Sequence, residues 1–260
     1  IWNQVWFEKV ADFPKLASSA AHLFGRPRSL SESFAAYNIP PTVVQAKWCV
    51  DYQMVRGINL FEYMFWSGSA GGRGMPGSYL GKPEFKDLAV YSNRAAYLLS
   101  QGVPAARIAL YHPTTSMWLG DSGADKSTLS IPKQLLDNQF DYDFVDEQAL
   151  TQTMKLKNKQ LVNVSGQGYS AIIIPSVTVI SSMGLNRLEA FQKAGGTVVF
   201  MGGQPKYVSD KAFMSMKMLQ GVNWGISEAS GNLTERVKAA LPRDVVFNKA
   251  APSVKYLHRK

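Results

Sequence analysis

The chain has 260 residues, of which 46% are hydrophobic and 18% charged, so it is globular and long enough to bury one large core or two ordinary ones. No window approaches the run of about 18 apolar residues that a membrane-spanning helix needs, so no membrane partner is predicted. The formal net charge of +9 raises the question of an acidic partner, but the basic residues are spread along the chain, which favours a solvated surface over nucleic acid.

Cysteine and histidine usage exclude further classes. The single Cys49 forbids an internal disulfide, and three histidines are too few and too scattered for a zinc site. The chain opens at Ile1 without an initiator methionine or a basic leader, which indicates a mature product or an excerpt. Whether the protein is secreted or periplasmic cannot be read from the sequence.

The first hundred residues alternate between helical and strand patterns. A proline leads into the first strand, and the second strand is aromatic-rich and almost continuously apolar, which predicts a parallel strand covered on both faces. The predicted elements are, in chain order, helical residues Val5–Phe24, a strand within Arg26–Phe34, a helix from Thr42 to about Val55, a strand in Ile58–Trp66 and a helix over Glu84–Gln101.

From Ala105 a second alternating series begins. Short apolar strands alternate with amphipathic helices, which predicts a doubly wound parallel sheet. Lys155, Lys157 and Lys159 alternate on an inserted hairpin. The predicted elements are a strand Arg107–Tyr111, a helix Ile131–Asn138, a strand Asp141–Val145, part of the hairpin in Leu161–Tyr169, a strand Ala171–Pro175, a helix Leu185–Ala194, a strand Thr197–Met201 and a helix Leu233–Ala240.

The two halves are interpreted as separate domains. Two parallel strands cannot hide both faces of a sheet, so the strands of the first half either join the later sheet or form the end of a barrel. We favour the barrel, with residues 1–104 as its C-terminal portion and residues 105–260 as a second domain. In parallel β/α proteins ligands gather at the carboxyl ends of strands, and Glu32 stands at such an end.

Several strings of the chain resemble a known family. They are Lys15–Phe34, Lys47-Trp-Cys-Val-Asp51, Arg56-Gly-Ile-Asn59, Met75-Pro-Gly-Ser-Tyr, the helix with Tyr97-Leu-Leu, and Phe140-Asp-Tyr-Asp-Phe-Val-Asp-Glu. Together they resemble glycoside hydrolase family 106, the α-L-rhamnosidases, over roughly residues 16–149. Related barrel families share this arrangement of segments.

The resemblance implies a TIM-type (β/α)8 catalytic barrel followed by a flavodoxin-like, glutamine-amidotransferase-like domain, in a polypeptide that continues upstream. It also implies an inverting glycoside hydrolase with a glutamate base, a glutamate acid and a calcium ion that helps to hold the sugar. Glu32 aligns with a catalytic glutamate, which we take as the base, and we expect the acid upstream. The family pattern places a histidine where this chain has Glu62 and Tyr63, so the exact sugar stays open.

Six further residues are candidates for binding the carbohydrate substrate. Glu62 lies among aromatic residues, where a carboxylate is rare unless it is functional or paired with Arg56 or Arg73. Aromatic rings stack on sugars but pack in cores more often, and a polar residue inside an apolar strand is either a structural hydrogen-bonding group or a hydroxyl ligand. The candidates are Trp48, Asn59, Glu62, Tyr63, Trp66 and Arg73.

The second domain carries weaker signals. Val199-Phe-Met-Gly-Gly-Gln resembles a phosphate-binding turn but lacks a Gly-x-Gly-x-x-Gly pattern. A working amidotransferase needs a cysteine nucleophile, and Cys49 precedes the domain, which we therefore interpret as architectural or substrate-shaping. Two other functions stay open: a related barrel glycosidase such as a β-galactosidase, and a non-catalytic carbohydrate-binding protein.

Overall fold

The structure is a computed structural model and describes residues 13–34, 41–63, 83–210, 216–218 and 232–260. Its contacts divide the chain into two units. Unit 1 comprises residues 1–21, 26–102 and 259, and unit 2 comprises residues 22–25, 103–258 and 260. The change of unit at residue 103 lies next to the predicted boundary between residues 104 and 105.

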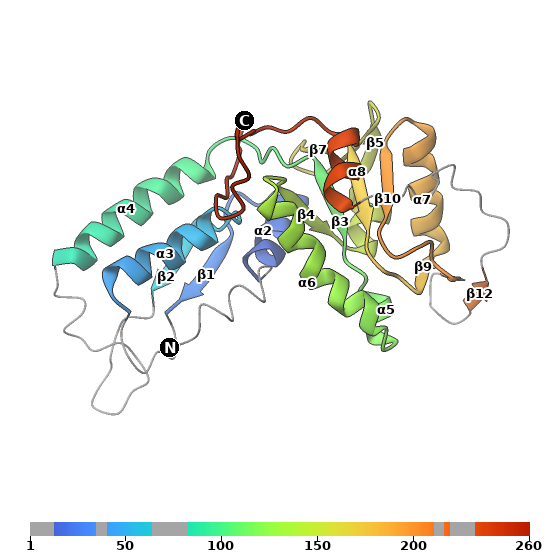
Figure 1. Ribbon diagram of the computed structural model, residues 1–260, viewed down its shortest axis with the longest axis horizontal. Helices are drawn as coiled ribbons and strands as arrows, with labels where there is room; N and C mark the ends of the chain where they lie inside the picture. Colours follow the sequence, from blue (N-terminus) through green and yellow to red (C-terminus); the bar gives the residue numbers. More distant parts are fainter. Residues whose placement is uncertain (1–12, 35–40, 64–82, 211–215, 219–231) are drawn as a thin grey trace. The chain divides into compact units, whose positions relative to one another are not determined.

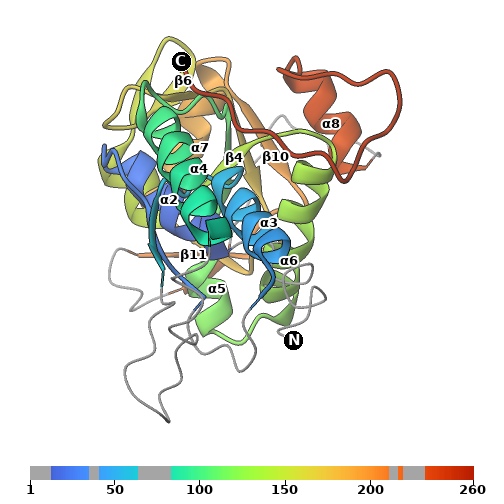
Figure 2. The same ribbon diagram turned by 90° about the vertical axis from the view of Figure 1, so that its left-hand side faces the viewer.

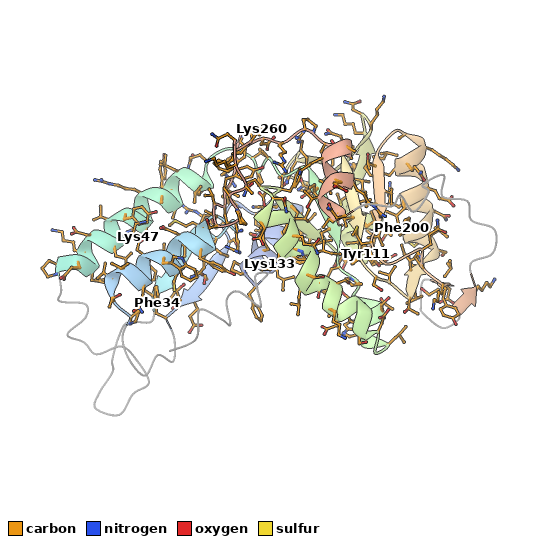
Figure 3. All side chains as sticks on the ribbon, viewed as in Figure 1. Phe34, Lys47, Tyr111, Lys133, Phe200 and Lys260 are labelled. Carbon is orange, nitrogen blue, oxygen red and sulfur yellow. The ribbon has the colours of Figure 1, made fainter. Side chains whose placement is uncertain are left out.

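Unit 1 is a two-stranded parallel sheet backed by helices, and α3 and α4 lie side by side (Figure 2). Its core lies between these two helices and one face of the strands, where Phe34 packs with Val50 and Leu88 (Figure 3). The elements are α2 (Phe13–Leu23), β1 (Leu30–Ser33), α3 (Val43–Met54), β2 (Leu60–Tyr63) and α4 (Pro83–Ser100), and their order follows the prediction (Figure 1).

Local sequence signals explain where α3 begins and how β2 follows it. The Thr42 side chain accepts a hydrogen bond from the Gln45 amide, and the Gln45 side chain accepts one from the Thr42 amide. This capping box satisfies two amide groups at the helix start and confirms the predicted cap. Gly57 has a φ of +95°, a left-handed conformation that glycine adopts at low cost, and the chain turns there into β2.

Unit 2 is built on a four-stranded, wholly parallel sheet with the order β10-β8-β3-β4. The chain starts in the interior of this sheet, adds β4 on one side and then returns to add β8 and β10 on the other. The strands are β3 (Ile108–Tyr111), β4 (Tyr142–Val145), β8 (Ala171–Ile174) and β10 (Thr197–Phe200). The helices are α5 (Thr114–Trp118), α6 (Ser122–Asp137), α7 (Ser182–Lys193) and α8 (Leu233–Ala240).

Each face of this sheet carries its own core. Ile108 and Leu110 point to the face covered by α6 and α8, whereas Ala109 and Tyr111 point to the face covered by α7. The strand β8 is buried along its whole length, as its continuous apolar run predicts. Figure 1 shows α7 and α6 with the sheet between them. Within the described residues, no helix is long and apolar enough to cross a membrane.

Several elements of unit 2 were not predicted. The helix expected over Ile131–Asn138 begins nine residues earlier, because Asp121 caps a polar first turn that carries no apolar signal. The inserted hairpin is a three-stranded antiparallel sheet. Its strands are β5 (Lys155–Lys157), β6 (Gln160–Val162) and β7 (Gly168–Tyr169), and they follow a π-helical turn, η2 (Ala149–Thr153). The remaining strands are β9 (Val179–Ser181), β11 (Tyr207–Ser209) and β12 (Met216–Met218).

A buried carboxylate on β4 ties several of these elements together. Asp143 has no exposed surface and accepts hydrogen bonds from Gln167 Nε2 at 2.8 Å and from Tyr169 Oη at 2.9 Å. His22 Nδ1 lies 2.8 Å from the same carboxylate. A buried carboxylate is tolerable only with such partners, so this network belongs to the framework of unit 2.

Candidate active site

The parallel pairing of β1 and β2 places Glu32 directly beside Glu62. The register aligns Leu30 with Leu60, Ser31 with Phe61 and Glu32 with Glu62. Adjacent strands lie about 4.8 Å apart, and residues paired in this way point to the same face of the sheet. The two carboxylates are therefore neighbours, one residue from the carboxyl end of each strand.

This pair lies on the open face of the sheet. Leu30 and Leu60, two residues before the glutamates and on the same face, are 52% and 42% exposed. The prediction that the second strand is covered on both faces is therefore wrong for the part of the chain that the structure describes. The opposite face carries Phe61 and Tyr63, which pack against α3 and α4.

An asparagine side chain holds the two strands in this register. Asn59 Oδ1 accepts a hydrogen bond from the Ser29 amide at 2.8 Å, and Asn59 Nδ2 donates to the Pro27 carbonyl at 2.9 Å and to the Leu99 carbonyl at 3.3 Å. The Arg28 guanidinium donates to the Asn59 carbonyl at 2.8 Å. Both the oxygen and the nitrogen of this buried side chain bond to the backbone, which gives Asn59 a structural role in holding the two strands.

The two predicted aromatic residues that the structure describes, Tyr63 and Trp48, do not lie on the face of the glutamates. Tyr63 points away from Glu62 and lies 5.5 Å from the Phe34 ring, and its burial raises the pKa of its hydroxyl. Trp48 is 41% exposed on α3 and lies 5.2 Å from the Tyr52 ring, so it belongs to the helical layer behind the sheet. Trp66 and Arg73 lie outside the described residues.

Neither glutamate has a protein partner in the described residues. Among the described residues, no side-chain hydrogen bond or ion pair involves the carboxylate of Glu32 or Glu62, and the Arg56 guanidinium instead donates to the Tyr52 carbonyl and lies over the Tyr52 ring. Two adjacent, solvent-facing carboxylates at strand ends have the composition that glycosidic hydrolysis requires, one group for the proton and one for water or carbon.

Calcium binding needs six to eight oxygen ligands. Within the described residues, no group of three or more acidic, histidine or cysteine side chains is arranged to hold a metal. Glu32 and Glu62 alone do not satisfy that requirement. The calcium ion that the family resemblance implies therefore does not fit these residues by themselves.

In unit 2, the helix starts at the edge of the sheet where ligands bind in doubly wound folds are capped by the chain's own side chains. Asp121 accepts hydrogen bonds from the amides of Gly123 and Ala124 at the start of α6, and from the Thr178 hydroxyl at 2.5 Å. The Thr178 hydrogen bond lowers the pKa of the Asp121 carboxyl. The helix start that could hold a phosphate is thus occupied.

The start of α7 is occupied in the same way. The Ser181 hydroxyl donates to Glu147 and also caps the Gly184 amide, while the Tyr111 hydroxyl donates to Glu147 at 2.6 Å. Desolvation and the nearby Glu147 raise the pKa of the Tyr111 hydroxyl. Residue types alone did not single out Asp121 and Glu147, although a helix-capping Asp at Asp121 was a readable signal.

The glycine turn after β10 also leaves no room for a phosphate. A Cβ atom on Gly202 would lie 2.7 Å from the Ser176 Cα atom, so the turn packs directly on the loop after β8. In Val199-Phe-Met-Gly-Gly-Gln, Gly202 thus serves a close approach of two backbones and Gly203 takes a left-handed conformation with a φ of +83°. The resemblance of this string to a phosphate-binding turn is explained by packing.

The fold of the chain is found among solved glycosidases. A rhamnosidase from Novosphingobium sp. PP1Y matches with a TM-score of 0.57 and 18% identity over 78% of this chain and 21% of that chain. An apo exo-carrageenase of family GH42 from Bacteroides ovatus matches with a TM-score of 0.57 and 12% identity over 90% of this chain and 32% of that chain. A catalytic mutant of a GH42 β-galactosidase from G. stearothermophilus matches with a TM-score of 0.53 and 13% identity over 74% of this chain and 29% of that chain.

These matches define the class of the chain: a mixed α/β protein with parallel sheets whose structural neighbours are glycosidases. The family model for α-L-rhamnosidase, glycoside hydrolase family 106, matches residues 3–260, and the chain belongs to this family. No curated protein matches the chain. The chain spans between a fifth and a third of the length of the three solved structures.

Proposed function

We propose that the chain supplies one wall of the active site of an α-L-rhamnosidase, with Glu32 as the catalytic base. The observation that carries this proposal is the position of Glu32 near the carboxyl end of a parallel strand, on the open face and in register with Glu62. Membership of the rhamnosidase family supplies the reaction class. The substrate is then a carbohydrate with a terminal α-L-rhamnosyl group, of plant polysaccharide or glycoside origin.

Unit 1 is proposed to be the C-terminal part of a (β/α)8 barrel that the upstream polypeptide completes. Leu30 and Leu60 expose apolar surface on the face that becomes the interior when a sheet closes into a barrel. The helix α2 has the same need for a cover, because Phe13 and Leu16 are 57% and 41% exposed while Lys15 is buried. Such inverted amphipathicity indicates that another part of a larger fold packs on the outer face of α2.

The register of β1 and β2 bears on whether hydrolysis inverts or retains the configuration of the sugar. Retaining glycosidases place their two carboxyl groups about 5–5.5 Å apart and inverting ones about 6.5–9.5 Å apart. Residues paired on adjacent strands are about 4.8 Å apart at their backbones, which suits the shorter spacing. The inverting mechanism of the family thus requires an acid other than Glu62, from the upstream polypeptide, with Glu62 binding the sugar beside the base.

Unit 2 is proposed to be a flavodoxin-like domain with an architectural role. The strand order β4-β3-β8-β10 corresponds to the first four positions of the flavodoxin order 2-1-3-4-5. The capping of α6 by Asp121 and of α7 by Ser181, which Glu147 holds by a hydrogen bond, supports the absence of a nucleotide-binding role. The one cysteine, Cys49, lies on α3 in unit 1, which supports the absence of amidotransferase chemistry.

Substitution in the complete protein tests the catalytic role. We expect Glu32→Gln to lower kcat on an aryl α-L-rhamnoside by about 10²–10⁴-fold, the usual contribution of a general base, while the thermal unfolding curve stays the same. Glu84→Gln, which removes an exposed carboxylate from the first turn of α4, is the matched control and should keep full activity. Near-normal hydrolysis by Glu32→Gln would contradict the proposal.

A β-galactosidase is the second candidate, because a GH42 β-galactosidase shares the fold with a TM-score of 0.53. Release of galactose rather than rhamnose from a panel of aryl glycosides would favour it. Binding of rhamnosides without release of any sugar would favour the non-catalytic carbohydrate-binding alternative. NMR observation of the first-formed anomer of the released sugar distinguishes inversion from retention.

A further inference from the structure

The hairpin formed by β5 and β6 in unit 2 concentrates positive charge on one surface. Lys155 and Lys157 are exposed on β5, while Leu156 between them packs on the core. Lys159 is exposed in the turn that joins the two strands. Alternation along the strand puts Lys155 and Lys157 on the same outward face, and Lys159 adds a third exposed lysine in the adjoining turn.

The segment that contains the hairpin has no acidic residue of its own. The sequence contains no Asp or Glu between Glu147 and Glu189, a stretch that holds four basic residues. None of the ion pairs among the described residues involves Lys155, Lys157 or Lys159. Most lysines of a solvated surface alternate with carboxylates, so this row is a distinct cationic surface, which we call the lysine row.

The backbone of the hairpin turn holds a lysine where glycine is favoured. Asn158 and Lys159 have φ values of +49° and +63°, and the flanking residues Lys157 and Gln160 pair across the strands. This is a two-residue turn of type I′, in which Asn-Gly is the preferred sequence because both positions are left-handed. The second position of this turn therefore carries a long side chain in a conformation that lysine adopts less readily than glycine.

The Lys159 side chain is also supported from below. Its Cδ atom would lie 3.3 Å from a Cβ atom on Gly195, so its aliphatic stem rests against the turn after α7. Lys193, also exposed, lies two residues before that glycine. Figure 1 shows β5 near this end of α7. The stem is packed and the ammonium group is left to solvent, which is the arrangement that presents a charge to a partner.

From these observations we propose that the lysine row binds an anionic polysaccharide, a chain with regularly repeated carboxylate or sulfate groups. The proposal rests on the proposed function in one respect: a polysaccharide-processing enzyme meets such polymers. A row of exposed ammonium groups matches a linear polyanion through charge alone. The outward face of the hairpin carries no aromatic ring on which a base could stack, which disfavours single-stranded nucleic acid.

The lysine row and the candidate active site belong to different units of the chain. The glutamates belong to β1 and β2 of unit 1, and the hairpin is an insertion before β8 of unit 2. The hairpin turn lies next to the loop that enters β10, at the amino edge of the sheet, whereas ligands of doubly wound folds bind at the carboxyl edge. The lysine row is therefore a separate polymer-binding surface.

Lysines on an edge strand also have a structural use, because they hinder edge-to-edge pairing. The two roles make opposite predictions for Lys159→Gly. Glycine fits the left-handed turn better, so we expect thermal stability to stay the same or rise while polymer affinity falls. A purely structural lysine would change stability or aggregation and leave polymer binding intact.

The test measures binding of the complete protein to polygalacturonate, dextran sulfate, neutral dextran and duplex DNA at low and moderate salt. The triple variant Lys155→Gln/Lys157→Gln/Lys159→Gly should weaken polyanion binding by about tenfold and reduce its dependence on salt. The matched control, Lys126→Gln/Lys238→Gln/Lys249→Gln, removes three exposed lysines from elsewhere in unit 2 and should change affinity by less than about twofold.

Binding to polygalacturonate, dextran sulfate or both that is lost in the triple variant supports the proposal, and the two polymers show whether carboxylate or sulfate is preferred. Equal losses in both variants, or no binding by the wild type, would overturn it. Tighter binding to DNA than to either polysaccharide would overturn it in favour of nucleic acid. Hydrolysis of a small neutral rhamnoside by the wild type, measured in parallel, reports on the proposed function separately.

Discussion

The two units bury their cores in different ways. In unit 2 the parallel sheet is covered on both faces, and its buried strands expose almost nothing to solvent. In unit 1 one face of the strand pair packs on α3 and α4, while the face with Leu30 and Leu60 is open. A closed core is self-sufficient, whereas an open apolar face requires a further layer, and the candidate catalytic glutamates stand on that open face.

The largest stability effect is expected in the closed core of unit 2. Phe191 on α7 has no exposed surface and lies against Gly196. Truncation by Phe191→Ala should lower the free energy of unfolding of unit 2 by about 3–5 kcal/mol, through lost burial and an unfilled cavity. Chemical denaturation of the wild type and the variant measures this, and a loss below about 1 kcal/mol would contradict the two-faced burial.

The stability effect of a substitution on the open face of unit 1 should depend on whether another part of the protein covers that face. Leu30→Ser changes an exposed side chain, so in the 260-residue chain we expect a change within about 0.5 kcal/mol. In the complete protein the same change should cost about 2 kcal/mol or more, because a barrel interior would cover the leucine. Equal small effects in both contexts would show that nothing covers this face.

The next prediction concerns the stability that the buried network around Asp143 contributes to unit 2. His22→Ala removes the histidine beside Asp143, while Gln167 and Tyr169 still donate to the buried carboxylate. We expect a loss of roughly 2–3 kcal/mol from unit 2, the cost of weakening a buried polar pair. Lys126→Gln on the outer face of α6 is the control and should be neutral in the same melt.

Asn59→Ala probes the register of unit 1. The variant leaves the Ser29 amide and the Pro27 carbonyl without their present partners, which should cost about 1–3 kcal/mol and loosen the pairing of β1 with β2. Activity of the complete protein should fall more than stability alone explains, since the pairing sets the position of Glu32. Unchanged activity with reduced stability would separate the register from catalysis.

The smallest effect is a pH dependence in unit 2. Burial lowers the pKa of His112 below the usual 6.5, so the unfolded chain binds the proton more readily than the folded one. Stability from this group is complete above pH 6.5 and should fall as the pH drops through that value. Thermal melts between pH 7.5 and 5.5 should show a slope that His112→Gln reduces, and an unchanged slope would exclude His112 as its source.

Much of the fold followed from local pattern. The buried runs such as Ala171–Ile174, the capping box at Thr42 and the amphipathic helix over Pro83–Ser100 were all readable, because propensity and periodicity act within a few residues. The start of α6 was not, since its first turn is polar and its cap at Asp121 gave the only local signal.

In the candidate site, too, local features were readable from the sequence, whereas features that depend on side-chain direction were not. Glu32 was identifiable at a strand end, and the strings Leu30-Ser-Glu and Leu60-Phe-Glu place a glutamate at the same step of each strand. The assignments of Asn59, Tyr63 and Trp48 to the substrate depended on which way each side chain points. In the structure, the Asn59 side chain bonds to the backbone of the neighbouring strand, Tyr63 packs in the core behind the sheet and Trp48 lies in the helical layer.

By itself, then, the sequence determined the alternation of strands and helices, the family to which the segments point and the strand-end position of Glu32. Only the tertiary structure decided that Glu32 faces the same side as Glu62, and that Asp121 and Glu147 form hydrogen bonds with the chain's own groups at the starts of α6 and α7. The physical reason is register: pairing two strands one residue differently turns every side chain to the other face, and the contacts that set the pairing lie some thirty residues apart in the chain.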